Sequence, residues 1–149
     1  MKKFILNTRI WALAILAVGF VACEDDGEPE DYKIVNALLG KWNVTHQGSV
    51  VNGTVQYTAV DNEGCAADYI AFDDNNFERG EFHSDGSGNC TQEVDNGTYY
   101  VEFGNVYLAT ETDTTTVDIL TLDKTKLQVV YSAPDSGSLI FLKLQKEME

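Results

Sequence analysis

The chain has 149 residues, which suits a single domain with one hydrophobic core. It carries 24 acidic residues against ten Lys and Arg, giving a formal net charge of −14 at neutral pH. A surface this acidic is repelled by nucleic acid and by anionic lipid head groups, so the composition argues against nucleic-acid binding and against charge-driven membrane binding.

The N-terminal segment has the layout of a secretory signal peptide. Lys2, Lys3 and Arg9 supply positive charge, and thirteen uncharged, mostly apolar residues follow at positions 10–22. A helix that crosses the ~30 Å hydrocarbon core of a bilayer needs roughly 20 apolar residues, so this segment is too short to be a transmembrane helix. We therefore expect residues 1–22 to be removed on export.

An acidic segment follows the signal peptide. Six of the eight residues from Glu24 to Asp31 are acidic, and Gly27 and Pro29 interrupt them. Like charges repel, and the segment offers nothing apolar to bury. Residues 23–31 are therefore predicted to be a solvated tether before a folded domain of residues 32–149.

One short helix is predicted at the start of this domain. Ile34, Val35 and Leu38 recur at helical spacing, and Gly40 follows them as a residue that can end a helix. The pattern predicts a helix over residues 32–39.

The rest of the domain alternates between strand-like runs and turn residues. Asn52-Gly53 is the clearest hairpin signal, and Pro134 falls in a turn rather than inside a strand. The nine predicted strands are residues 41–45, 55–60, 68–72, 77–83, 98–103, 106–110, 116–122, 126–132 and 138–144.

These strands predict an all-β fold class. Short loops favour pairing between strands that are neighbours in sequence, which gives an antiparallel up-and-down meander. A meander of about eight to nine strands that closes into a barrel has no exposed edges. Two stacked sheets are the alternative arrangement. The predicted architecture is the closed barrel with one short N-terminal helix.

The end of the signal peptide indicates lipidation. Phe20-Val21-Ala22-Cys23 resembles the lipobox of bacterial lipoproteins, in which the cysteine is acylated, palmitate included, and becomes the first mature residue. The acids after Cys23 resemble the signal that sends Bacteroidota lipoproteins to the surface of the outer membrane. The resemblance implies a surface-exposed protein whose membrane partner is reached through acyl chains on Cys23. Otherwise the signal is cleaved elsewhere, Cys23 is a spare thiol and the acids are only a spacer.

The other two cysteines form a natural pair once Cys23 carries lipid. Cys65 and Cys90 lie outside any CxxC or Cys/His zinc spacing. An exported protein folds in an oxidising compartment, so a buried structural disulfide between them is expected.

A second resemblance concerns the folded domain. Gly40-Lys41-Trp42 directly after the predicted helix resembles the G-x-W element of lipocalins. The resemblance covers residues 34–146 and implies a barrel whose floor is closed by Trp42. The family commonly packs a late arginine on this tryptophan, and Lys143 or Lys146 would take that place here. Spacing similar to the lipocalin-like domains of Bacteroidota lipoproteins is carried by Cys65, Tyr69–Phe72, Asn75–Phe77, Cys90 and Gly97–Tyr99.

Sequence motifs for chemistry do not stand out. His46 and His83 are the only histidines, and neither has a cysteine or carboxylate at a metal-ligand interval. The chain has no G-x-S-x-G, no H-E-x-x-H and no phosphate-binding glycine loop. We therefore predict no enzyme activity, no cofactor and no metal site.

The interior of the barrel decides between two functions. One hypothesis is a binding protein that holds a small apolar or amphipathic ligand inside the barrel. The other is a cell-envelope protein with a filled barrel that binds a protein or glycan partner through acidic loops. An eight-stranded barrel is just wide enough for either. The aromatic residues that can line a pocket or fill a core are Tyr57, Tyr69, Phe72, Phe82, Tyr99, Phe103, Tyr107 and Tyr131.

Overall fold

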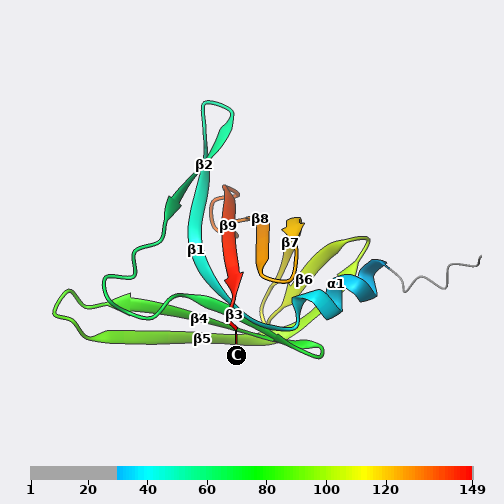
Figure 1. Cartoon of the computed structure of the whole chain (residues 1–149), viewed down its shortest axis with the longest axis horizontal. Coiled ribbons are helices and arrows are strands. Elements are labelled where there is room, and N and C mark those ends of the chain that lie inside the picture. Colours follow the sequence, from blue (N-terminus) through cyan, green and yellow to red (C-terminus); the bar gives the residue numbers. More distant parts are fainter. Residues whose placement is uncertain (1–29, 149) are drawn as a thin grey trace, which may run out of the picture.

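The computed structural model describes residues 30–148, so the expectations for the signal peptide, for Cys23 and for most of the tether lie outside the described residues. The described part contains one helix and nine strands (Figure 1). No helix within it is both long and apolar enough to span a bilayer. The elements are α1 (Glu30–Leu38), β1 (Gly40–Val51), β2 (Thr54–Ala59), β3 (Tyr69–Asp73), β4 (Asn76–Ser84), β5 (Cys90–Glu102), β6 (Asn105–Ala109), β7 (Thr114–Leu122), β8 (Lys126–Ser132) and β9 (Leu139–Lys146).

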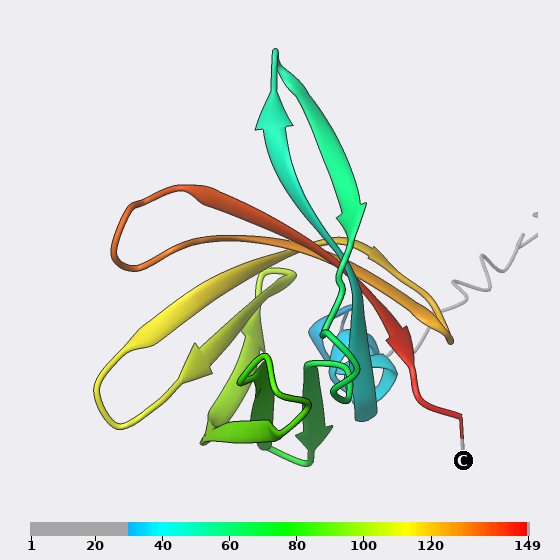
Figure 2. The same ribbon diagram turned by 90° about the vertical axis from the view of Figure 1, so that its left-hand side faces the viewer.

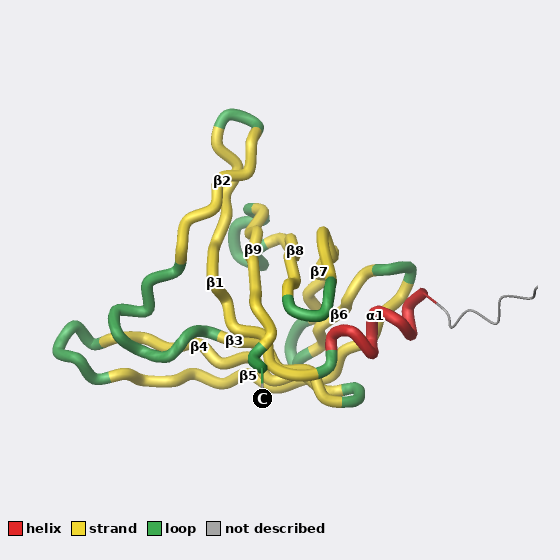
Figure 3. The backbone as a smooth tube through the Cα atoms, in the orientation of Figure 1, coloured by secondary structure: helices red, strands yellow, loops and turns green. Residues whose placement is uncertain are grey.

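Eight of the strands form a closed antiparallel barrel, which confirms the predicted fold class. β1 and β3 to β9 follow one another around the sheet, and β1 pairs with β9 to close it. The helix lies at one end of this barrel, and the turns of several hairpins lie at the other (Figure 3). Inward-facing residues alternate with outward-facing ones along each strand, as in other small barrels.

The prediction that each strand pairs with its sequence neighbour is wrong at β2. This strand pairs with β1 alone, whereas β3 pairs with residues 40–43 of β1. The reason is the length of β1, which has 12 residues and continues to Val51 rather than ending at Thr45. Its far part, residues 46–51, is free to pair with β2. The β1–β2 hairpin therefore stands out beyond the barrel as an arm (Figure 1).

A second arm is formed by β4 and β5. Strand β5 begins at Cys90 instead of the predicted Thr98, and residues 90–97 pair with β4 only. Gly97 lies where β5 separates from β6. The close packing favours glycine there, because a Cβ would be 2.2 Å from the carbonyl oxygen of Ala109. The added segment is polar on both faces, so it lacks the alternation that reveals a half-buried strand.

The helix begins two residues earlier than predicted, at Glu30. The carboxylate of Asp31, expected in the tether, accepts hydrogen bonds from the backbone N–H groups of Phe103 at 3.2 Å and Gly104 at 2.9 Å. These contacts attach the first turn of α1 to the β5–β6 turn. The run of acids around Asp31 predicted a solvated segment. In the structure, backbone N–H groups from a turn distant in sequence bind the Asp31 carboxylate instead.

The floor of the barrel is built around Trp42, whose side chain is 0% exposed. Its indole N–H donates a hydrogen bond of 2.7 Å to the carbonyl oxygen of Leu38, the last residue of α1. The Nζ atom of Lys146 lies 5.1 Å from the Trp42 ring centroid and 3.4 Å from the carbonyl oxygen of Ala37. Lys143 lies elsewhere, so Lys146 is the cation that packs on the floor tryptophan.

Replacing Trp42 is expected to destabilise the whole domain. Trp42→Ala removes the largest buried side chain and its hydrogen bond, so it should lower the free energy of unfolding by about 3–5 kcal/mol. The matched control is Phe103→Ala, because Phe103 is 88% exposed, and it should change stability by no more than about 0.5 kcal/mol. Urea unfolding followed by circular dichroism measures both. Equal effects would contradict the role of Trp42 in the floor.

A disulfide joins Cys65 and Cys90 with a Cα–Cα distance of 5.7 Å. It connects the 60–68 segment between β2 and β3 to the outer end of the β4–β5 arm. The expectation that it is buried is wrong, since Cys65 is half-buried and Cys90 is exposed. The bond lies on an arm outside the barrel core, where it restrains two segments that have few apolar contacts of their own.

Loss of this disulfide should lower the stability of the domain mainly by raising the conformational entropy of the unfolded chain, and not by changing the packing of the core. Closing a loop over a sequence separation of 25 residues is worth about 3 kcal/mol in the loop-entropy model, which sets the expected loss for the Cys65→Ser/Cys90→Ser variant. Denaturation with and without dithiothreitol measures it, and the reductant should affect only the wild type. Two free thiols in mass mapping of exported protein would refute the bond.

Candidate functional site: a cavity inside the barrel

The barrel contains a cavity of about 800 Å³ that is open to solvent at one end. Its lining extends from Leu38 at the floor to loop residues Glu111, Asp113 and Pro134 at the other end. Figure 2 shows the β1–β2, β6–β7 and β8–β9 hairpins splayed outward around that end, with the helix behind them. The volume falls in the range of ~300–1,000 Å³ that is usual for small-molecule sites. The interior is therefore a pocket and not a solid core.

The deep part of the cavity is apolar because the inward positions of the strands carry aliphatic side chains. In register, Val106 lies opposite Val117, and Ile119 lies opposite Val129. These alternate with outward residues such as Leu120, which is 50% exposed. Apolar lining residues from β6, β7 and β8 are Val106, Leu108, Val117, Ile119, Leu127 and Val129.

The aromatic residues that the sequence left ambiguous are divided between several roles. Tyr69, Phe72 and Tyr131 line the cavity. Tyr99 is buried against Phe72, with ring centroids 4.8 Å apart, and its hydroxyl has no hydrogen-bond partner among the described residues. Tyr107 stacks on Tyr100 at 4.7 Å. Three of the eight aromatics therefore line the pocket, and the others lie elsewhere, including Phe103, which is exposed.

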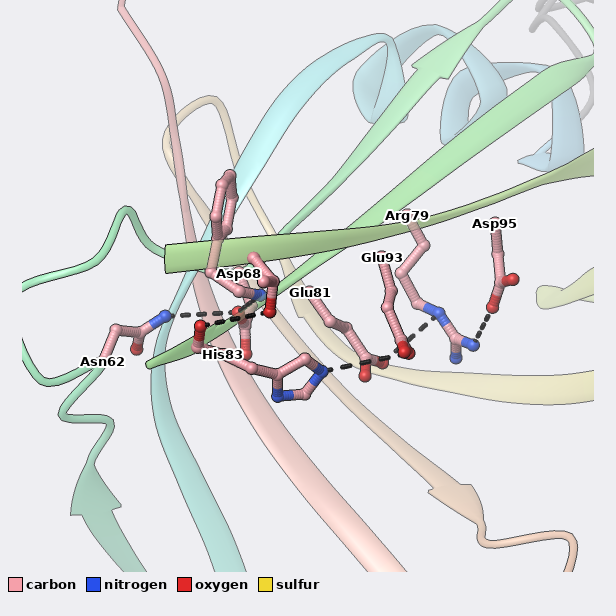
Figure 4. A network of polar contacts seen from close by, with 9 residues as sticks. Asn62, Asp68, Arg79, Glu81, His83, Glu93 and Asp95 are labelled. Carbon is pink, nitrogen blue, oxygen red and sulfur yellow. Dashed lines mark hydrogen bonds and ion pairs between the residues drawn. The ribbon is translucent and has the colours of Figure 1, made fainter. Parts of the chain in front are cut away.

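A charged cluster lies on the inner face of the β4–β5 arm (Figure 4). Arg79 is directly opposite Asp95 in the register, and its Nη2 group donates a hydrogen bond to that carboxylate. The Nε atom of Arg79 lies 3.5 Å from Glu81 Oε1. Burial lowers the pKa of Arg79, but the Asp95 hydrogen bond and the charge of Glu81 outweigh it and raise the pKa. The guanidinium is permanently charged and is shared by two acids.

The charges of this cluster affect the pKa of Tyr131 on β8. Burial raises the pKa of Tyr131, the charge of Arg79 lowers it, and the charge of Glu81 raises it further. Tyr131, Arg79 and Glu81 line the same cavity, although β8 and β4 are not paired. With a raised pKa the hydroxyl stays neutral at physiological pH, so it can both donate and accept a hydrogen bond inside the cavity.

Acidic groups also surround the upper part of the cavity. The Oδ1 atom of Asp68 accepts hydrogen bonds from the Phe82 backbone N–H at 2.7 Å and from the Asn62 amide at 3.2 Å. Five acids and one base lie among the described residues that line the cavity: Asp68, Glu81, Asp95, Glu111, Asp113 and Arg79. The polar part of the pocket is therefore strongly negative.

Each of the two histidines has one polar side chain near its ring. The Nδ1 atom of His46 is 3.1 Å from Thr45 Oγ1, and His83 Nε2 is 3.9 Å from Glu93 Oε2. Within residues 30–148, no three His, Cys, Asp or Glu side chains are gathered as a metal site. The described part of the chain thus presents a cavity with charged walls and not a coordination centre.

Sequence reasoning did not single out Arg79, Glu81 or Asp95. A signal was present, because Arg79 and Glu81 have the same strand parity as Phe77, which is buried inside the barrel. Charges at inward-facing positions of a strand are costly unless they are paired or solvated. Such a pattern indicates a partner on the next strand or access to solvent. Here Arg79 has Asp95 as its partner on β5, and its side chain is about half exposed.

The barrel has counterparts in known proteins. Residues 38–129 match the family model of the lipocalin-like domain. A lipocalin-like protein from Bacteroides uniformis has a similar structure, with a TM-score of 0.54 at 14% identity, covering 74% of this chain and 99% of that one. A protein from Bacteroides eggerthii gives a TM-score of 0.50 at 15% identity, with coverage of 74% and 99%. At such low identity these likenesses show the fold alone. No curated protein matches the sequence.

Proposed function

This chain belongs to the lipocalin-like domain family, and on that premise we propose that it is a binding protein that holds a small amphipathic ligand inside its barrel. The observation that carries the proposal is the cavity of about 800 Å³. An apolar deep end and a polar upper end are what a molecule with an apolar body and a polar head requires. The fold is in general one of binding rather than catalysis.

The competing function, a filled barrel that binds a protein or glycan through acidic loops, has less support. Its premise is a solid core, whereas the space above Leu38 is open. Acidic loops do surround the mouth, so a partner that contacts them remains an outcome to be tested. Native mass spectrometry of protein purified from its own host tests the choice directly, because a bound small molecule appears as a discrete mass shift.

Blocking the cavity should abolish binding of an apolar probe. Ile119→Trp places a large ring inside the cavity, whereas Leu120→Trp places the same ring on the outer wall, one residue away on β7. The neutral dye N-phenyl-1-naphthylamine should bind the wild type and Leu120→Trp alike. Ile119→Trp should weaken binding by about tenfold or more, because the new ring takes up space in which the dye would bury apolar surface. Burying one apolar side chain contributes about 1.5–3 kcal/mol. Fluorescence titration measures all three.

Equal dye binding by the two tryptophan variants would contradict a ligand site inside the barrel. Absence of dye binding by the wild type would also contradict it. Melting curves of both variants show whether either substitution has unfolded the domain, and only folded variants are compared.

We propose in addition that the protein is anchored in the outer membrane through acyl chains on Cys23 and faces the cell surface. The support is the lipobox-like sequence before Cys23 and the acidic residues after it. Each buried CH₂ of an acyl chain contributes about 0.8 kcal/mol to membrane binding, so two or three chains give a stable anchor.

Removing the acceptor thiol should release the protein from the membrane fraction. Cys23→Ala leaves no site for acylation, so the protein should not incorporate labelled palmitate in its host and should not fractionate with the outer membrane. The matched control is the Cys65→Ser/Cys90→Ser variant, which also removes cysteines but should keep the label. Retention of Cys23→Ala in outer membranes washed without detergent would refute the anchor.

A further inference from the structure

We propose that the cavity is selective for amphiphiles with a positively charged, amine-type head and that it rejects carboxylates of the same chain length. The inference rests on the proposed function, because it assumes that a ligand enters the barrel. It goes beyond that function by naming the chemistry of the ligand head group. Its basis is the arrangement of charges between the apolar deep end and the mouth.

The first step concerns the only base in the site. Among the described residues that line the cavity, Arg79 is the sole cation. Its Nη2 group is bound to Asp95, and its Nε atom is 3.5 Å from Glu81. One positive charge thus faces two negative ones, which leaves the cluster with a net charge of −1. The guanidinium therefore has no free charge to neutralise the carboxylate of a ligand.

The second step concerns the acids of the upper cavity. The contacts of Asp68 come from a backbone N–H and an Asn62 amide, and Asp113 accepts the backbone N–H of Thr114 at 2.7 Å. These donors are neutral, so they stabilise the carboxylates without cancelling their charge. Glu111 lies in the same β6–β7 loop as Asp113 and also lines the cavity. No Lys or Arg within residues 30–148 pairs with any of the three acids within 4.0 Å. The mouth attracts cations and repels anions.

The third step concerns the apolar deep end. A head group held near Arg79 and Glu81 leaves the chain of the ligand to extend toward Phe72, Phe77 and Leu38 at the floor. Tyr131 lines the same cavity as these charges, and its hydroxyl can accept an N–H from an ammonium group. The head therefore meets net negative charge and an acceptor while the chain meets aliphatic and aromatic side chains.

The test compares three ligands that share one alkyl chain: decylamine, decanol and decanoate. Their displacement of N-phenyl-1-naphthylamine is measured with the purified protein at neutral pH, where the amine is charged. Decylamine should bind about tenfold more tightly than decanoate in low salt, with decanol between them. The difference should shrink at about 1 M salt, where the Debye length is ~3 Å.

Two variants locate the charges responsible. Glu81→Gln/Asp95→Asn leaves Arg79 free to pair with the carboxylate of a ligand, while Asp68, Glu111 and Asp113 remain, so it should abolish the preference for decylamine over decanoate. The matched control is Glu102→Gln/Asp118→Asn, which removes the same charge from exposed outward-facing positions and should keep the wild-type preference. If the cluster variant fails to fold, Glu111→Gln/Asp113→Asn on the exposed β6–β7 loop should still reduce the preference about threefold.

Each outcome is decisive in one direction. Decanoate binding as tightly as decylamine overturns the charge selectivity while leaving the cavity as a binding site. An equal loss of preference in the cavity and outer-wall variants also overturns it, because overall charge would then explain the preference. Failure of all three ligands and of the dye removes the proposed function itself.

Discussion

The hydrogen bond from the Trp42 indole N–H to the Leu38 carbonyl oxygen is the contact on which the architecture depends. It joins the last residue of the helix to the start of β1 across the turn at Gly40, whose φ of +106° favours glycine. Trp42 is also opposite Lys146 in the β1–β9 pairing that closes the barrel. The helix end, the first strand and the last strand therefore meet at one buried side chain.

A large floor has a consequence for the rest of the interior. Trp42, Leu38 and the residues packed on them form a buried cluster at the end of the barrel beside α1, and the cavity lies above Leu38. Strands β1, β4 and β5 extend past the closed part as arms, and the disulfide links one arm to the 60–68 segment. The same division places the apolar surface deep and the charged side chains near solvent.

The charges inside the barrel follow from this openness. Arg79, Glu81 and Asp95 are each about half exposed, so they keep contact with water while they face the cavity. A fully closed core would make such a cluster costly. At about half exposure the cost is smaller, and the charges remain accessible to a ligand that enters the cavity. The charged cluster is therefore compatible with the barrel because the cavity beside it is open to solvent.

Local patterns predicted much of the fold because they reflect local physics. The Asn52-Gly53 turn and the strands from residue 106 onward are close to their predicted bounds, since tight turns and alternating burial leave a clear periodicity. The far parts of β1 and β5 were missed because most of their residues are exposed, so they lack the alternation of buried and exposed positions that reveals a strand. The pairing of β3 with β1 depends on how long β1 is, which no short window contains. Arg79 was missed because its partner, Asp95, lies 16 residues later in the chain, and only the pairing of β4 with β5 brings the two together.

The environment of Trp42 in the native protein tests the central claim most directly. In a Trp11→Phe variant Trp42 is the only indole, because the chain contains two tryptophans. Iodide quenching of its fluorescence is then measured in the folded protein and in urea. A plugged barrel floor predicts emission that iodide does not quench until the protein unfolds. Full quenching in the folded state would show that Trp42 is exposed and would contradict the closed floor.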